Sequence, residues 1–269
     1  PELVVNLLST ARGNTDLAIA NIIGSNIANI LLILGCASLV YPLTIKRNTT
    51  WKEIPFALLA VVLVLLMTSD VVLAGQSINV LDRIDGLVLL SFFVIFLYYT
   101  FGISKAEGEG EEVEPVRPMR AVALVVVGVG ALVLGGKLTV DAAVTLASLA
   151  GISERVIGLT VVAIGTSLPE LLTSVMAAYR RHVDIAVGNV VGSNIFNVFW
   201  ILGLSSAIKP LPLSAGGVAD IKMAVAASFF LFLAMFVGKK HELERWQGAV
   251  MIVVYVAYLA WLATGSISA

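Results

Sequence analysis

Residues 156–179 read VIGLTVVAIGTSLPELLTSVMAAY, an apolar segment that nevertheless contains Pro169 and Glu170. A helix needs about 20 such residues to cross a bilayer core of ~30 Å. A carboxylate at the centre of that core costs about 2.5–3.5 kcal/mol on insertion scales, so it indicates a functional group. Proline has no N–H for the carbonyl of Gly165, which leaves that oxygen free to face a cavity. We interpret this segment as a broken spanning helix that carries a functional carboxylate.

The composition of the whole chain is that of a membrane protein. Hydrophobic residues make up 59% of the sequence and charged residues 13%, against roughly 45–50% and 25% in soluble domains. The apolar runs are long and lack the alternating pattern of an outer-membrane barrel. The sequence therefore predicts an all-α polytopic membrane protein, with the lipid bilayer as its main partner. A net charge of −1 argues against a nucleic-acid partner, and the single Cys36 excludes a disulfide framework.

The apolar runs predict a short helix and eight spans. The short helix covers 1–12, and the spans lie near 16–40, 54–74, 83–102, 119–147, 154–179, 183–208, 219–238 and 245–264. Eleven of the 17 Lys and Arg residues fall in alternate connections, which we expect to be cytoplasmic by the positive-inside rule. The longest of these connections, 103–118, is predicted to be a solvated acidic linker.

The sequence also contains an internal repeat. A shift of 168 residues aligns 1–43 with 169–211 at 18 identical positions, which include Pro, Glu, Gly, Ser and Asn. Five spans separate equivalent helices, so the second copy is expected to enter the membrane with the opposite orientation, as in secondary transporters. We expect two inverted repeats of five helices, in 1–102 and 119–269. The first is expected to lack its first helix and half of its second.

Polar residues recur on the repeated helices at positions that suit a cation. Each copy carries one intramembrane glutamate, Glu2 or Glu170, and Thr166 and Ser167 precede the second. The companion helices place polar residues at i, i+4 and i+8, on one stripe: Asn21, Ser25 and Asn29 in the first copy, and Asn189, Ser193 and Asn197 in the second. Carboxylate, amide and hydroxyl oxygens are hard donors that suit Ca²⁺ or Na⁺.

These polar residues could have roles other than that of cation ligands in a transporter. Intramembrane Ser and Asn often only hydrogen-bond a neighbouring helix, and we expect that role for Asn26 and Asn194, which lie off the stripe. The same oxygens could line a cation channel, although paired repeats favour alternating access. An intramembrane hydrolase is disfavoured, because no Ser–His pair, paired Asp or HExxH pattern lies within a span.

The motifs GTSLPE and GNVVGSNIFNVFWILG, echoed by PELVV and ANIIGSNIANILLILG, resemble the two alpha-repeats of the cation/calcium exchanger superfamily, in particular its prokaryotic sodium/calcium exchangers. The resemblance implies ten helices, a prokaryotic inner-membrane location and no enzymatic activity or cofactor. It implies a cation site made of Glu2, Ser25, Asn29, the Ala163 carbonyl, Thr166, Ser167, Glu170, Ser193 and Asn197. Some members of this family have Asp at the position of Asn197.

The function expected from this resemblance is antiport of Ca²⁺ against Na⁺ by alternating access. A Ca²⁺/H⁺ exchanger of the same fold remains the alternative, in which a glutamate would carry the proton.

Overall fold

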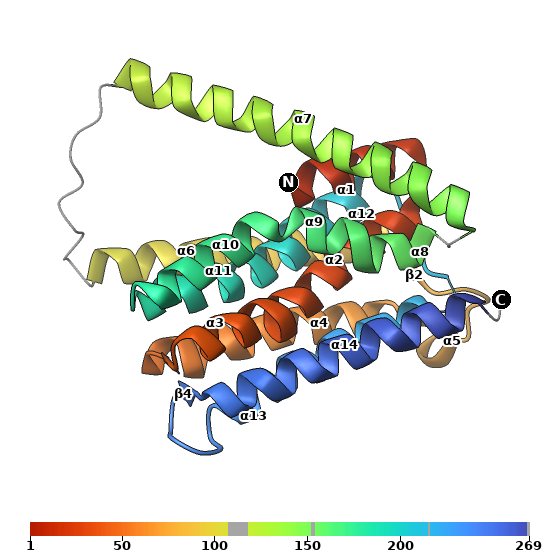
Figure 1. The fold of residues 1–269 in the computed structure, drawn as a ribbon. Coiled ribbons are helices and arrows are strands. Elements are labelled where there is room, and N and C mark those ends of the chain that lie inside the picture. The colour runs from red at the N-terminus through yellow and green to blue at the C-terminus, as the bar shows by residue number, and fades with distance from the viewer. Residues whose placement is uncertain (107–117, 152–153, 215, 268–269) are drawn as a thin grey trace.

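A computed structural model describes residues 1–106, 118–151, 154–214 and 216–267, which form a helical bundle (Figure 1). The part before residue 107 contains α1 (Glu2–Arg12), α2 (Thr15–Ala28), the π-helical η1 (Asn29–Leu34), α3 (Gly35–Val40), the π-helical η2 (Thr49–Glu53), α4 (Ile54–Met67), α5 (Asp70–Leu73) and α6 (Arg83–Ala106). The later part contains α7 (Pro118–Ala150), α8 (Glu154–Ile157), the π-helical η3 (Gly158–Val162), α9 (Ala163–Thr166), α10 (Leu168–Tyr179), α11 (Val183–Phe196), the π-helical η4 (Asn197–Leu202), α12 (Gly203–Ile208), α13 (Gly217–Ala234) and α14 (Arg245–Ile267).

Six continuous helical segments of the described chain are long and apolar enough to cross a membrane, and a bent pair could supply a seventh. They are Thr15–Val40, Thr49–Met67, Arg83–Gly102, Val183–Ile208, Gly217–Ala234 and Arg245–Thr264. They match six of the predicted spans, so the chain is an integral membrane protein. Helix α7 covers the predicted span 119–147. The predicted linker 103–118 lies mostly outside the described residues.

The break predicted within the span 154–179 is confirmed, because the helix bends by 54° between Gly158–Thr166 and Leu168–Tyr179. Ser167, at the bend, has φ −89° and ψ 5°, and Pro169 lies in the first turn of α10. Proline is tolerated in a first turn, where its missing N–H leaves no hydrogen bond unmade. Pro169 therefore begins a new helix instead of interrupting an old one.

The predicted span 54–74 is too long, since α4 ends at Met67 and the short α5 follows separately. Thr68 Oγ1 donates to Val64 O at 2.7 Å, and Ser69 Oγ donates to Leu65 O at 2.5 Å. Side-chain hydrogen bonds of this kind compete with the helical backbone ladder. Thr68 and Ser69 thus lie at the point where α4 ends within the apolar segment 54–74.

Two short antiparallel ribbons join the halves of the chain. Strand β1 (Leu43–Thr44) pairs with β4 (Glu242–Leu243), and β2 (Val80–Leu81) pairs with β3 (Leu211–Pro212). In each ribbon, leucines from both strands are buried. Each ribbon therefore links a loop from the first half of the chain with one from the second.

In two helix crossings the backbones approach equally closely, and each crossing contains one of the repeated glycines, Gly35 or Gly203. A Cβ on Gly86 would lie 2.7 Å from Gly203 O, where α6 crosses α12, and a Cβ on Gly248 would lie 2.7 Å from Gly35 O, where α14 crosses α3. Small residues allow helix backbones to approach in membranes. The same contact is thus made twice in one chain.

The segment from α2 to α3 lies at the centre of the bundle. In its most apolar stretch 94% of the residues are buried, whereas in that of α6 only 17% are buried. Large apolar side chains such as Val94 and Tyr98 on α6 are exposed, as expected of a surface that faces lipid. The polar residues of α2 are therefore enclosed by protein.

Candidate cation-binding site

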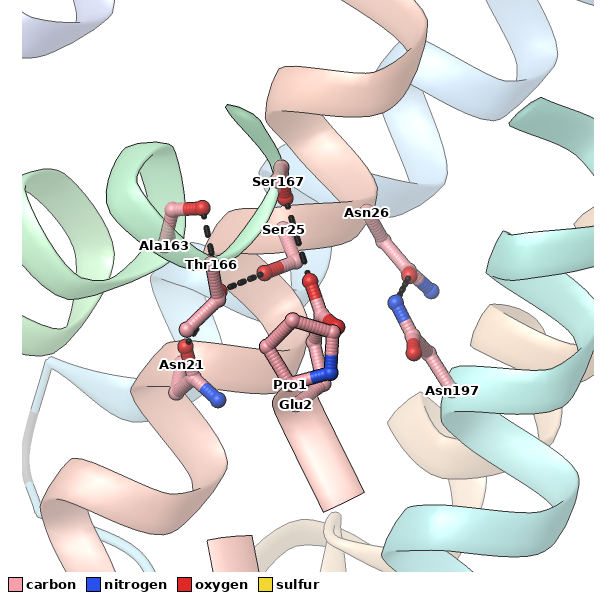
Figure 2. Close-up of polar contacts among 9 residues, drawn as sticks. All are labelled: Pro1, Glu2, Asn21, Ser25, Asn26, Ala163, Thr166, Ser167 and Asn197. Atoms are coloured by element: carbon pink, nitrogen blue, oxygen red, sulfur yellow. Dashed lines mark hydrogen bonds and ion pairs between the residues drawn. The ribbon is translucent and has the colours of Figure 1, made fainter. Parts of the chain in front are cut away.

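The bend between α9 and α10 places two hydroxyl residues against α1 and α2. Ser167 Oγ donates to Glu2 Oε1 at 3.4 Å, and Glu2 is only 5% exposed (Figure 2). The first glutamate of the repeat thus contacts the bend that precedes the second, which brings the two copies of the motif together.

The Thr166 hydroxyl lies within hydrogen-bond distance of three other oxygen atoms. Its Oγ1 lies 3.3 Å from both Asn21 Oδ1 and Ala163 O, and 3.5 Å from Ser25 Oγ (Figure 2). One hydroxyl has a single proton to donate, so it satisfies only one of these acceptors at a time. The Thr166 hydroxyl thus faces more oxygen acceptors than it has protons, an arrangement that a cation can complete, although the buried Asn21 Nδ2 also lacks an acceptor in the described residues.

Glycine allows α2 to approach this bend closely. A Cβ on Gly24 would lie 2.9 Å from both Ala163 Cβ and Leu159 Cα. A Cβ on Gly158 would lie 2.8 Å from Ala20 Cβ and 3.2 Å from Leu17 O. No larger side chain fits at Gly24 without displacing backbone, so the glycine sets the distance between Ser25 and Thr166.

Four buried asparagines, Asn26 and Asn194 at the ends of α2 and α11 and Asn29 and Asn197 at the starts of η1 and η4, join these two helical segments. Asn29 Nδ2 donates to Asn194 Oδ1 at 2.9 Å, and Asn197 Nδ2 donates to Asn26 Oδ1 at 3.0 Å. Asn26 Nδ2 and Asn194 Nδ2 each donate to the backbone oxygen of the other residue, at 3.3 and 3.4 Å. The interhelical role predicted for Asn26 and Asn194 is confirmed.

Glu170 lies in the first turn of α10 and is less enclosed than Glu2. The residue is half-buried, its carboxylate is within electrostatic range of Glu2, and its backbone oxygen accepts from Asn189 Nδ2 at 3.4 Å. Asn189 Nδ2 also donates to Ser174 Oγ at 3.0 Å. The hydrogen bond between Asn189 and Ser174 joins α10 to α11. This agrees with the alternative interpretation, in which intramembrane Ser and Asn only hydrogen-bond a neighbouring helix.

Ser193 is half-buried on α11, and within the described part of the chain no side-chain hydrogen bond links it to the other candidates. The predicted ligand set does not include Asn21, although Asn21 Oδ1 contacts Thr166 Oγ1. Its position on the Asn21–Ser25–Asn29 stripe is the sequence signal that could have included it.

Among the candidate ligands, two oxygens are buried without a hydrogen-bond partner in the described residues, Asn29 Oδ1 and Glu170 Oε2; a few polar atoms elsewhere, such as Thr10 Oγ1 and Thr50 Oγ1, share this property. Leaving a buried polar atom unsatisfied costs about 1–3 kcal/mol, and more when the group is charged. A cation held by Asn29 Oδ1 and Glu170 Oε2 would offset that cost. The described ranges contain no group of three or more His, Cys, Asp or Glu that could hold a metal, so neutral oxygens would have to contribute.

The fold and this oxygen-lined centre are those of a polytopic membrane transporter. The family model described as "Sodium/calcium exchanger protein" matches residues 1–102 and 120–264. The chain therefore belongs to the sodium/calcium exchanger family.

Known proteins resemble the chain over nearly all of its length. A putative antiporter, CaxA, from Alkalimonas amylolytica is 34% identical, over 96% of this chain and 82% of that protein. The sodium/calcium exchanger MaX1 from Methanosarcina acetivorans is 30% identical, over 97% and 84%. A solved structure of the sodium-calcium exchanger NCX_Mj, soaked with Na⁺ and Ca²⁺, matches with a TM-score of 0.73 and 31% identity, over 97% of this chain and 81% of that one.

Proposed function

We propose that this protein exchanges Ca²⁺ for Na⁺ across the membrane. The observation that carries the proposal is that two candidate ligand oxygens, Asn29 Oδ1 and Glu170 Oε2, are buried without a hydrogen-bond partner in the described residues. One relative is named a sodium/calcium exchanger, and the similar NCX_Mj structure carries the same description. Family membership supports exchange of cations that include Ca²⁺, and the donor chemistry suits both ions.

The charge of the site explains why two ions would be coupled. Glu2 and Glu170 together supply two negative charges, which one Ca²⁺ or two Na⁺ would neutralise. The electrostatic cost of emptying such a site inside a membrane is high. Because both ions would use overlapping oxygens, binding of one would favour release of the other.

We further propose alternating access between two inverted repeats, in 1–102 and 119–269. Contacts between residues 168 positions apart support this architecture, because Asn26 and Asn194 each bond the other's backbone. Such reciprocal bonds are expected where two copies meet at a pseudo-two-fold axis. Transporters with inverted repeats place their substrate at such an interface.

A Ca²⁺/H⁺ exchanger is the second candidate. The proximity of Glu2 and Glu170 favours it, since two neighbouring carboxylates can share a proton when no cation separates them. In this mechanism a proton would replace Na⁺ as the ion that releases Ca²⁺.

Flux measurements distinguish the two candidates. Full-length protein is reconstituted into liposomes, and uptake of ⁴⁵Ca²⁺ is followed under an outward Na⁺ gradient at equal pH, or under a pH gradient without Na⁺. Uptake driven only by the Na⁺ gradient supports the proposal. Uptake driven by the pH gradient in the absence of Na⁺ would replace it with Ca²⁺/H⁺ exchange.

A further inference from the structure

We infer that Asn26 and Asn194, which lie outside the predicted ligand set, are positioning residues for the bound cation. Each fixes the side-chain amide of a candidate ligand on the opposite helix, so that the amide oxygen and not the NH₂ group faces the ion. The inference rests on the proposed function, because it takes Asn29 and Asn197 as cation ligands.

Both polar ends of each positioning residue are used, which fixes its orientation. The NH₂ group of Asn26 is held by the backbone oxygen of Asn194, so Asn26 Oδ1 faces Asn197 and accepts from its Nδ2 at 3.0 Å. Asn194 has the equivalent pair of bonds, from its NH₂ to Asn26 O and from Asn29 Nδ2 to its Oδ1. Asn26 is 1% exposed and Asn194 4%, so water does not replace these bonds.

The consequence for the ligands follows from amide chemistry. An asparagine side chain carries two donors on nitrogen and an acceptor oxygen, and rotation about its last bond exchanges them. With Asn197 Nδ2 bound to Asn26, the Oδ1 of Asn197 points away from that bond (Figure 2). Rotation would set Asn197 Oδ1 against Asn26 Oδ1, two acceptors without a proton, and would turn NH₂ toward the ion.

The same arrangement explains the unsatisfied oxygen of Asn29. Its Nδ2 is bound to Asn194 Oδ1, while its Oδ1 is buried without a partner in the described residues. If the Asn29 amide could rotate freely, its oxygen could turn away from the site in which it lacks a hydrogen-bond donor. The bond to Asn194 keeps the oxygen available for a cation.

A role in helix packing alone can be separated from positioning, because the chain offers a matched asparagine. Asn6 is fully buried, donates to Ala18 O at 2.7 Å and accepts from Ser205 Oγ. It joins three helices through its amide but has no hydrogen bond in the described structure to a candidate ligand. Asn6→Ala therefore removes a similar interhelical amide without releasing a ligand.

The test is a double-mutant cycle on Ca²⁺ affinity, measured by calorimetry on full-length protein in nanodiscs. Asn26→Ala should weaken Ca²⁺ binding about 10-fold, the lower range for loss of a group that orients a metal ligand. In an Asn197→Asp background both side-chain oxygens are acceptors and no amide needs orienting. There the same change should alter affinity less than about twofold, a non-additive result expected only of coupled residues.

Three outcomes decide between the roles. Equal losses of affinity from Asn26→Ala in both backgrounds, matched by Asn6→Ala, would reduce Asn26 to a packing residue. No loss from Asn26→Ala, when Asn197→Ala does weaken binding, would also overturn positioning but leave the proposed site intact. Unchanged affinity in a folded Asn197→Ala protein would instead overturn the ligand assignment itself, and melting temperatures show whether each variant is folded.

Discussion

At the scale of single residues, the site is defined by atoms that lack partners. A buried polar group without a hydrogen bond is rare in folded proteins, yet two such oxygens, Asn29 Oδ1 and Glu170 Oε2, belong to the candidate site. At the bend, the Thr166 hydroxyl has more acceptors within reach than its one proton can satisfy. Both features are expected where a desolvated cation completes the bonding.

Glu170→Gln tests the charge at this scale. The change keeps the size of the side chain but removes one of two negative charges and a possible bidentate ligand. We expect ⁴⁵Ca²⁺ flux in full-length protein to fall by at least about 100-fold, since even an outer-shell partner of a metal is worth 10–100-fold. Expression and melting temperature should be retained.

Glu53→Gln is the matched control, because Glu53 lies in η2, away from the bend. It should transport as the parent protein does. Retained flux in Glu170→Gln would remove this carboxylate from the site.

At the scale of elements, a few residues decide the path of each helix. The sequence predicted the broken helix from Pro169 and the polar stripes from their spacing. It did not reveal that a second helix begins at Leu168, at 54° to the first, because proline at a first turn and proline within a helix look alike in sequence. Asn26 was recognised only as a packing residue, since its bond to Asn197 depends on how two distant helices meet.

Gly24→Ala tests the close approach of α2 to the bend. A methyl group at this position would lie 2.9 Å from Leu159 Cα, so backbone must move and Ser25 must separate from Thr166. We expect Ca²⁺ affinity to fall by about 10-fold or more and the melting temperature to drop by several degrees, as for overpacking that costs about 1–3 kcal/mol.

Gly128→Ala on α7 serves as the control, because a Cβ there would meet nothing within 4 Å. Alanine at such a helical position is expected to be neutral or slightly stabilising. Equal tolerance of both substitutions would show that the approach at Gly24 is not required.

At the scale of the whole molecule, sequence and structure agree on a polytopic helical bundle. Gly35 and Gly203, which are 168 residues apart, each lie in a close helix crossing, Gly35 with Gly248 and Gly203 with Gly86. Hydropathy alone predicts the spans, because a segment that crosses a membrane must satisfy its backbone hydrogen bonds internally and so forms a long apolar helix. It could not predict the two ribbons, since β1 and β4 are two residues each and far apart in the sequence.

The proposed inverted orientation predicts which loops share a side of the membrane. In a Cys36→Ser background, Asn48→Cys and Lys240→Cys should react with a membrane-impermeant maleimide only from the cytoplasmic side. Lys209→Cys should react only from the opposite side. All three residues are exposed, and labelling of Lys209→Cys from the cytoplasm would contradict the inverted arrangement.

The most direct test of the cation site is an anomalous-difference map from crystals of the full-length protein soaked with Ca²⁺. We expect one peak about 2.3–2.6 Å from Glu170 Oε2 and Asn29 Oδ1, the usual distance from Ca²⁺ to oxygen, and expect Na⁺ at high concentration to remove it. A map with no peak near these oxygens, or with a peak that Na⁺ leaves unchanged, would contradict a shared site for the two ions.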